Sequence, residues 1–183
     1  MKFLTAIFGT GVYFYAAPIL FQYGHNSYFD IPINFIEPSI RDNIIFFFDL
    51  SRIVGMVADN LSFWIWVGIV ILTLITWFLL AFQIVRGVLL VAILLALTGA
   101  SLFGFYNFGS TIASATTEFR VLPEGCLTLQ ENTTYIIPAF YGTTALIVPV
   151  NTENNKLMGS FIPREASTLE CDIQKMTIGH IVK

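Results

Sequence analysis

The chain has 183 residues, which is enough for one membrane unit and at most one small domain. Apolar residues make up 56% of it and charged residues 11%, far below the roughly 25% of an ordinary soluble domain. The net charge is −3 and no basic cluster is present. This excludes nucleic-acid binding, which needs a basic face to displace counterions from phosphates.

Residues 1–22 are almost uncharged, with Lys2 as their only charged side chain. A secretory signal would carry a small residue where Tyr15 stands, so we favour a retained helix over a cleaved signal. The pattern predicts a first transmembrane helix over roughly Phe3 to Phe21. Pro18 is expected to kink its outer end.

Residues 23–60 are too polar to cross a bilayer. We expect a loop followed by an amphipathic helix over about residues 39–59, lying in the membrane interface. This helix either packs over the protein's own hairpin or docks a partner subunit. The predicted polar face consists of Arg41, Asp42, Asp49, Arg52 and Asp59.

Residues 61–108 contain no Asp, Glu or Lys, and Arg86 is their only full charge. A bilayer core about 30 Å thick needs roughly 20 apolar residues in a helix, and this stretch supplies that length twice. The short joint at residues 83–87 predicts a tight transmembrane hairpin. The alternative is a buried helical pair in a soluble core.

Two patterns within the hairpin point to its surroundings. Trp64 and Trp66 are typical of an aromatic belt at a membrane interface. Small residues recur every fourth position in the second helix and predict close packing against another helix. This helix-packing stripe consists of Ala92, Ala96, Ala100 and Gly104.

Residues 109–117 are small and polar and predict a linker. After them the sequence consists of short segments with the composition of β-strands, separated by turn residues. We expect a compact β domain over residues 118–183 with five or six strands, a barrel being one arrangement. The candidate strands are EFRVL, CLTLQ, TTYIIPAF, TTALIVPV, KLMGSFI and QKMTIGHIV.

The two cysteines, Cys126 and Cys171, bracket most of the predicted strands. A domain of this size buries little core and often needs a covalent link, so a disulfide is expected. Disulfides persist in oxidising compartments. We therefore expect the β domain in the periplasm or outside the cell and the N-terminus in the cytoplasm. Two reduced, buried cysteines are the alternative.

No nucleotide-binding loop, nucleophile elbow or metal-ligand cluster occurs in the sequence. The two histidines, His25 and His180, stand far apart. The acidic group of Glu165, Glu170 and Asp172 is interpreted as a solvated face. No enzyme activity, cofactor or metal is predicted.

The leading functional hypothesis is a non-enzymatic, multi-pass membrane subunit of a larger assembly, whose β domain makes protein–protein contacts outside the cytoplasm. Its partners would be the lipid bilayer and other membrane subunits, as a hetero- or homo-oligomer. One alternative is a stand-alone binding, sensing or immunity module. A further alternative is a channel or transport component that self-associates through the helix-packing stripe.

Overall fold

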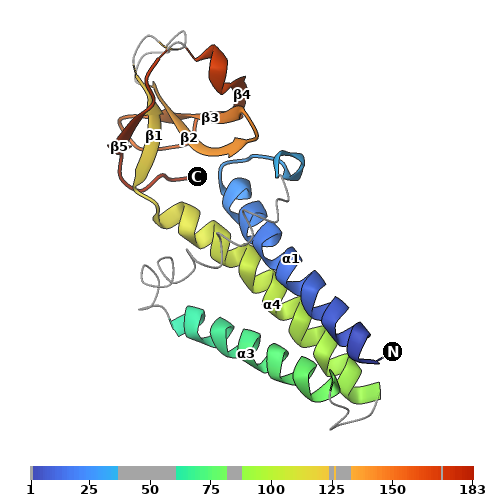
Figure 1. Cartoon of the computed structure of the whole chain (residues 1–183). Coiled ribbons are helices and arrows are strands. Elements are labelled where there is room, and N and C mark those ends of the chain that lie inside the picture. Colours follow the sequence, from blue (N-terminus) through green and yellow to red (C-terminus); the bar gives the residue numbers. More distant parts are fainter. Residues whose placement is uncertain (1, 37–60, 82–87, 124–125, 127–132, 170) are drawn as a thin grey trace. The chain divides into compact units, whose positions relative to one another are not determined.

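The computed structural model describes residues 2–36, 61–81, 88–123, 126, 133–169 and 171–183. The chain divides into two compact units (Figure 1). The helical unit comprises Met1–Gln22 and Pro38–Phe108, and the β unit comprises Tyr23–Glu37 and Gly109–Lys183. The described residues form three α-helices and one antiparallel sheet of five strands.

Helix α1 runs from Lys2 to Tyr28 and is longer than the predicted span. It passes through Pro18 and continues through Gly24, His25 and Asn26, where a loop was expected. Its last residues belong to the β unit, as does the short helix η1 (Ile33–Phe35). Burial of the segment that follows α1 in the core of the β unit explains why weak helix formers remain helical.

Helix α3 (Leu61–Ala81) matches the first arm of the predicted hairpin. Helix α4 (Val88–Ala115) begins as predicted but continues through most of the expected linker. The turn expected at residues 83–87 lies wholly outside the described residues, and so does the amphipathic helix predicted over residues 39–59.

The strands lie in the order β4-β3-β2-β1-β5, with every neighbouring pair antiparallel. This is a sheet with two edges rather than a barrel. Of the predicted strands, KLMGSFI contributes only isolated bridges and the first residue of β4, and CLTLQ lies largely outside the described residues. The strands are β1 (Glu118–Leu122), β2 (Thr133–Tyr141), β3 (Thr144–Asn151), β4 (Ile162–Glu165) and β5 (Gln174–Thr177).

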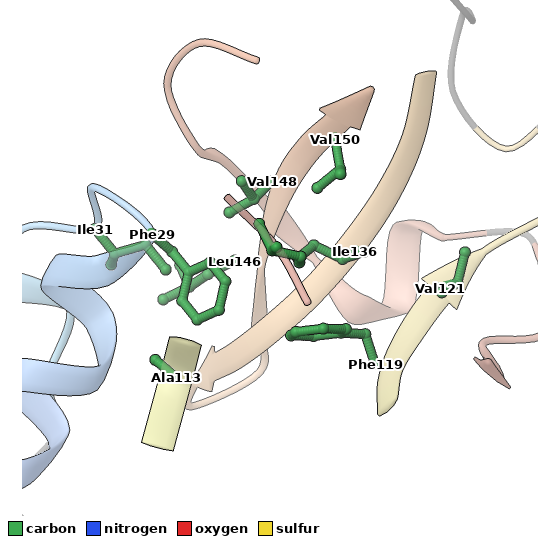
Figure 2. Packing of buried hydrophobic residues seen from close by; sticks show 10 residues of the cluster. Phe29, Ile31, Ala113, Phe119, Val121, Ile136, Leu146, Val148 and Val150 are labelled. Atoms are coloured by element: carbon green, nitrogen blue, oxygen red, sulfur yellow. The ribbon is translucent and has the colours of Figure 1, made fainter. Parts of the chain in front are cut away.

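One face of the sheet is covered by segments that adjoin helices, and we call it the helix-side face. Phe29 and Ile31, which follow α1, pack there with Ala113 of α4. Figure 2 shows their side chains gathered with residues of β1, β2 and β3. The strand residues of this core are Phe119, Val121, Ile136, Leu146, Val148 and Val150.

The opposite face carries the disulfide, and we call it the disulfide-side face. Strand residues alternate between faces, so Tyr135, Ile137 and Ile147 point to this side. Leu169 and the two cysteines pack over them. Both faces of the small sheet are therefore buried over its central strands.

The last residues of the chain tie the β unit together. Ile181 is buried in the core of the helix-side face, and its carbonyl oxygen accepts a hydrogen bond from the Tyr28 hydroxyl at 2.5 Å. Lys183 Nζ lies 2.7 Å from the Asp30 carboxylate and donates to the Ser27 carbonyl oxygen at 3.1 Å. The segment after α1 and the C-terminal segment thus hold each other in place.

Candidate functional site

Ser101 is the point at which side chains from the three described helices, α1, α3 and α4, meet, and we call it the Ser101 junction. Tyr13 of α1 donates its hydroxyl to Ser101 Oγ at 3.0 Å, and Trp66 of α3 donates its indole N–H to the Ser101 carbonyl oxygen at 3.1 Å. Ser101 Oγ donates in turn to the Thr98 carbonyl oxygen at 2.9 Å. Ser101 is fully buried and Tyr13 is 3% exposed, so water does not compete for these bonds.

Aromatic rings surround the Ser101 junction. Trp66 lies edge-on to Phe105 with ring centroids 4.7 Å apart, and it stacks on Phe108 at 5.3 Å. Phe108 also contacts Phe63 at 5.5 Å and Phe21 of α1 at 5.8 Å. Each such pair contributes about 0.5–1.5 kcal/mol beyond the area that it buries. The rings and the hydrogen bonds together fasten the three helices at one level.

Gly104 is the member of the helix-packing stripe that lies in this interface. A Cβ added at Gly104 would overlap the Trp66 indole ring, so the close approach of α3 and α4 requires glycine here. Ala92, Ala96 and Ala100 are exposed. Each step of four residues rotates the side-chain direction by about 40° around an α-helix. The members of the stripe therefore do not all lie on the face of α4 on which Gly104 meets Trp66.

The structure separates the two tryptophans that were predicted to form an aromatic belt. Trp64 is 55% exposed, whereas Trp66 lies among the packed rings and binds the Ser101 carbonyl. The sequence did not predict the role of Trp66, and it did not predict that Tyr13 would bind Ser101. A lone Ser in an apolar helix gives no signal of its partners, which come from distant parts of the chain.

Polarity in the helical unit is arranged with hydroxyls inside and large apolar side chains outside. Thr73 and Thr76 are buried, and each donates at 2.7 Å to the carbonyl oxygen four residues earlier. Every described helix of the unit exposes large apolar residues. They are Val12, Phe14, Tyr15, Trp64, Ile65, Ile71, Leu72, Ile75, Phe78, Val91, Ile93, Leu95 and Phe103.

Among the described helices, one segment meets the length and hydropathy expected of a membrane span, namely Val91–Ala115 of α4. Phe63–Leu79 of α3 is a shorter apolar stretch. Within Val91–Ala115, only 22% of the most apolar 18-residue stretch is buried. Length and composition alone do not distinguish such a helix from the core helix of a soluble protein.

The predicted interfacial polar face lies outside the described residues. It consists of Arg41, Asp42, Asp49, Arg52 and Asp59. The predicted disulfide between Cys126 and Cys171 is present, with the two Cα atoms 6.1 Å apart, within the usual range for a bridge. The bridge joins the segment after β1 to the segment before β5 across the disulfide-side face.

A row of exposed side chains, which the sequence did not predict, crosses the disulfide-side face. Arg164 of β4 pairs with Ala145 of β3, which pairs with Phe140 of β2. The guanidinium of Arg120 on β1 lies 5.2 Å from the centre of the Phe140 ring, and Arg120 pairs with Lys175 of β5. We call Arg164, Phe140, Arg120 and Lys175 the basic row. Only the strand register brings these residues together.

His25 lies in the last turns of α1, within the β unit. Its ring is 5.5 Å from that of Phe29, and its Nδ1 is 3.5 Å from the Asn26 side-chain oxygen. Burial lowers the pKa of His25 below its ordinary value, and the Asn26 contact offsets this in part. The surroundings therefore disfavour the charged form of the imidazole. His180 is exposed at the other end of the chain.

In the described residues, no group of three or more His, Cys, Asp or Glu side chains is placed to hold a metal ion. Comparison with protein-family models, with curated proteins and with solved structures finds no match. The features on which a function can be argued are therefore the surface of the helical unit, the Ser101 junction and the basic row.

Proposed function

We propose that this chain is a non-enzymatic integral membrane subunit of a larger assembly, and that its β unit contacts partners on the extracytoplasmic side. The helical unit would lie in the bilayer. The β unit would lie in an oxidising compartment, which a disulfide between Cys126 and Cys171 supports.

The observation that carries this proposal is the polarity of the helical unit. Helices of soluble proteins turn apolar side chains inward and polar ones outward. Here Thr73, Thr76 and Ser101 are buried, while residues such as Leu95 and Phe78 are exposed. Lipid chains accept apolar surface, and membrane helices satisfy their hydroxyls internally. Exposed apolar side chains on every described helix of the unit favour a lipid environment over water.

A charged substitution on the exposed apolar surface distinguishes a lipid-facing surface from a water-facing one. Leu95 is 66% exposed. Leu95→Lys should therefore be nearly neutral in water but should cost roughly 2.5–3.5 kcal/mol of insertion in a bilayer. We expect the wild-type chain to stay in the membrane pellet after a carbonate wash and the variant to be depleted there.

The control for this experiment is Val182→Lys in the β unit, where the wild-type side chain is 54% exposed. It should leave membrane retention unchanged. Wild-type chain that is released by carbonate, or Leu95→Lys chain that is retained like wild type, would contradict the proposal. Sizing of the particle in mild detergent, with its chains identified by mass spectrometry, then tests for partner subunits at fixed stoichiometry.

A second candidate function, a self-associating channel or transport component, is favoured by the exposure of Ala92, Ala96 and Ala100. Small residues on an exposed helix face allow close approach of another membrane helix. Replacing Ala96 and Ala100 with Leu should then break a homo-oligomer seen in detergent. An oligomer that survives both substitutions would exclude this candidate.

A further inference from the structure

We propose that the basic row is a docking surface for an acidic segment of a partner protein. This inference rests on the proposed function, because it gives the chemistry of the partner that the β unit would contact. It depends on charge, on the position of the row in the sheet and on the spacing of its cations.

The row carries more positive than negative charge. Arg120, Arg164 and Lys175 are all exposed. Among the described strand residues of this face, one carboxylate, that of Glu118, lies beside the row, and it forms an ion pair with Lys175. The two arginines therefore carry the excess charge. Guanidinium groups bind carboxylates through two parallel hydrogen bonds, and this makes arginine the preferred residue for such recognition.

Arg120 is already held in place for binding. Its guanidinium lies 5.2 Å above the Phe140 ring, a cation–π contact that limits side-chain motion. Phe140 is 37% exposed, while Ile137 and Ala145 beside it are buried. Aromatic and arginine side chains that lie over buried apolar residues are enriched at the centre of protein interfaces.

The row lies on the face of the sheet opposite to the segments that join α1 and α4 to the β unit. The row is on the disulfide-side face, whereas Phe29 and Ala113 pack on the opposite face of the same sheet. These two residues belong to the segments through which α1 and α4 join the β unit. The row therefore points away from the face to which the helix ends are attached.

The spacing of the row predicts the form of the bound segment. Neighbouring strands are about 4.8 Å apart, so the backbones at Arg164 on β4 and Arg120 on β1 are separated by three spacings, at least roughly 14 Å, because Arg120 pairs with Ile137 and is offset along the strand from Phe140. An extended peptide advances about 3.3 Å per residue. Two carboxylates about four residues apart would reach both arginines, with an apolar side chain between them against Phe140.

A peptide titration tests the chemistry directly. The full chain, in a detergent with an uncharged headgroup, is titrated with capped Glu-Ser-Phe-Ser-Glu and with capped Gln-Ser-Phe-Ser-Gln. We expect the Glu peptide to shift the NMR signals of the Arg120 and Arg164 Nε–H groups and to bind more tightly. Arg120→Gln and Arg164→Gln should each weaken it roughly threefold, while Lys156→Gln, exposed in the loop after β3, should not. Equal binding of the two peptides, or no shift at these arginines, would overturn the proposal.

Photo-cross-linking identifies the occupant in the native membrane. Phe140→p-benzoylphenylalanine keeps an aromatic ring in the row, and Glu153 is the exposed control site. We expect an adduct at position 140 to another polypeptide, with cross-linked residues in an Asp- or Glu-rich segment, and less adduct after Arg120→Gln and Arg164→Gln. An adduct to lipid, to a second copy of this chain or to a segment without carboxylates overturns the proposal, as does the absence of any adduct. Membrane retention of the same variants reports separately on the proposed function.

Discussion

Gly104 lies directly against the indole ring of Trp66, and no other residue type fits between them without displacing that ring. The same indole donates its N–H to the Ser101 carbonyl oxygen. A substitution at Gly104 therefore acts on the packing of α3 against α4 and on the Ser101 junction together.

We expect Gly104→Ala to destabilise the helical unit by about 1–3 kcal/mol, the usual cost of overpacking. The measurement is the free energy of unfolding in mild detergent, followed by tryptophan fluorescence. Gly99→Ala is the matched control, because a Cβ at Gly99 has no neighbour within 4 Å. It should be neutral or stabilising by up to about 1 kcal/mol. Equal effects of the two substitutions would show that Trp66 does not occupy this position.

Tyr13→Phe removes the buried hydrogen bond from α1 to the Ser101 junction but keeps the ring that packs 6.4 Å from Phe105. We expect a loss of about 0.5–1.5 kcal/mol. A double-mutant cycle with Ser101→Ala isolates the contact and should give a coupling energy above about 0.5 kcal/mol. Additive effects of the two substitutions would contradict a direct bond between them.

The disulfide closes a loop whose ends are 45 residues apart in sequence. In the chain-entropy model such a bridge stabilises the folded state by about 4 kcal/mol. We expect the double substitution Cys126→Ser and Cys171→Ser to lower the melting temperature of the β unit by roughly 15 °C or more. A reducing agent should do the same to the wild-type chain and have no effect on the variant. A wild-type melting temperature that resists reduction of the bridge would contradict the prediction.

The lowered pKa of His25 predicts a pH dependence of stability. The unfolded chain binds a proton at the ordinary value of 6.5, whereas the folded β unit disfavours the charged ring because it is buried. The stabilisation from the neutral ring is therefore complete above pH 6.5 and is lost as the pH falls through and below that value. Chemical unfolding between pH 8 and pH 5 (an interval of roughly three units around the reference value) measures this loss.

His25→Gln should flatten this dependence, because the variant lacks the ring whose pKa is lowered in the folded state. Carboxylates titrate at lower pH in both chains, so the difference between the wild type and the variant reports on His25 alone. A decline in stability that is the same in His25→Gln as in wild type would assign it to other groups.

Local sequence patterns predicted the strands whose bounds are set by neighbouring residues in the chain. Strand β1 was predicted with its observed bounds because Pro123 follows it directly, and β2 and β3 were placed to within a residue or so. Turn signals and alternation specify such strands without help from tertiary contacts. The disulfide was predicted because a small domain with two cysteines has one way to form it.

Features that depend on contacts between distant segments could not be predicted. Helix α1 continues to Tyr28 although Gly24 and Asn26 favour a turn, and α4 continues to Ala115, with Ala113 buried in the core of the β unit. The basic row depends on strand register, which a shift of one residue would move to the other face. The Ser101 junction depends on which faces of three helices meet.

The mutual dependence of Tyr28 and Ile181 has a consequence for synthesis of the chain. These residues are 153 positions apart. At about 5–20 residues per second, the ribosome takes roughly 8 to 30 seconds to make the later one. During that interval the core that receives Phe29 and Ile31 lacks its C-terminal member, and the Tyr28 hydroxyl lacks its acceptor. A premature stop codon just before Ile181 would make this incomplete core permanent and lower the stability of the product.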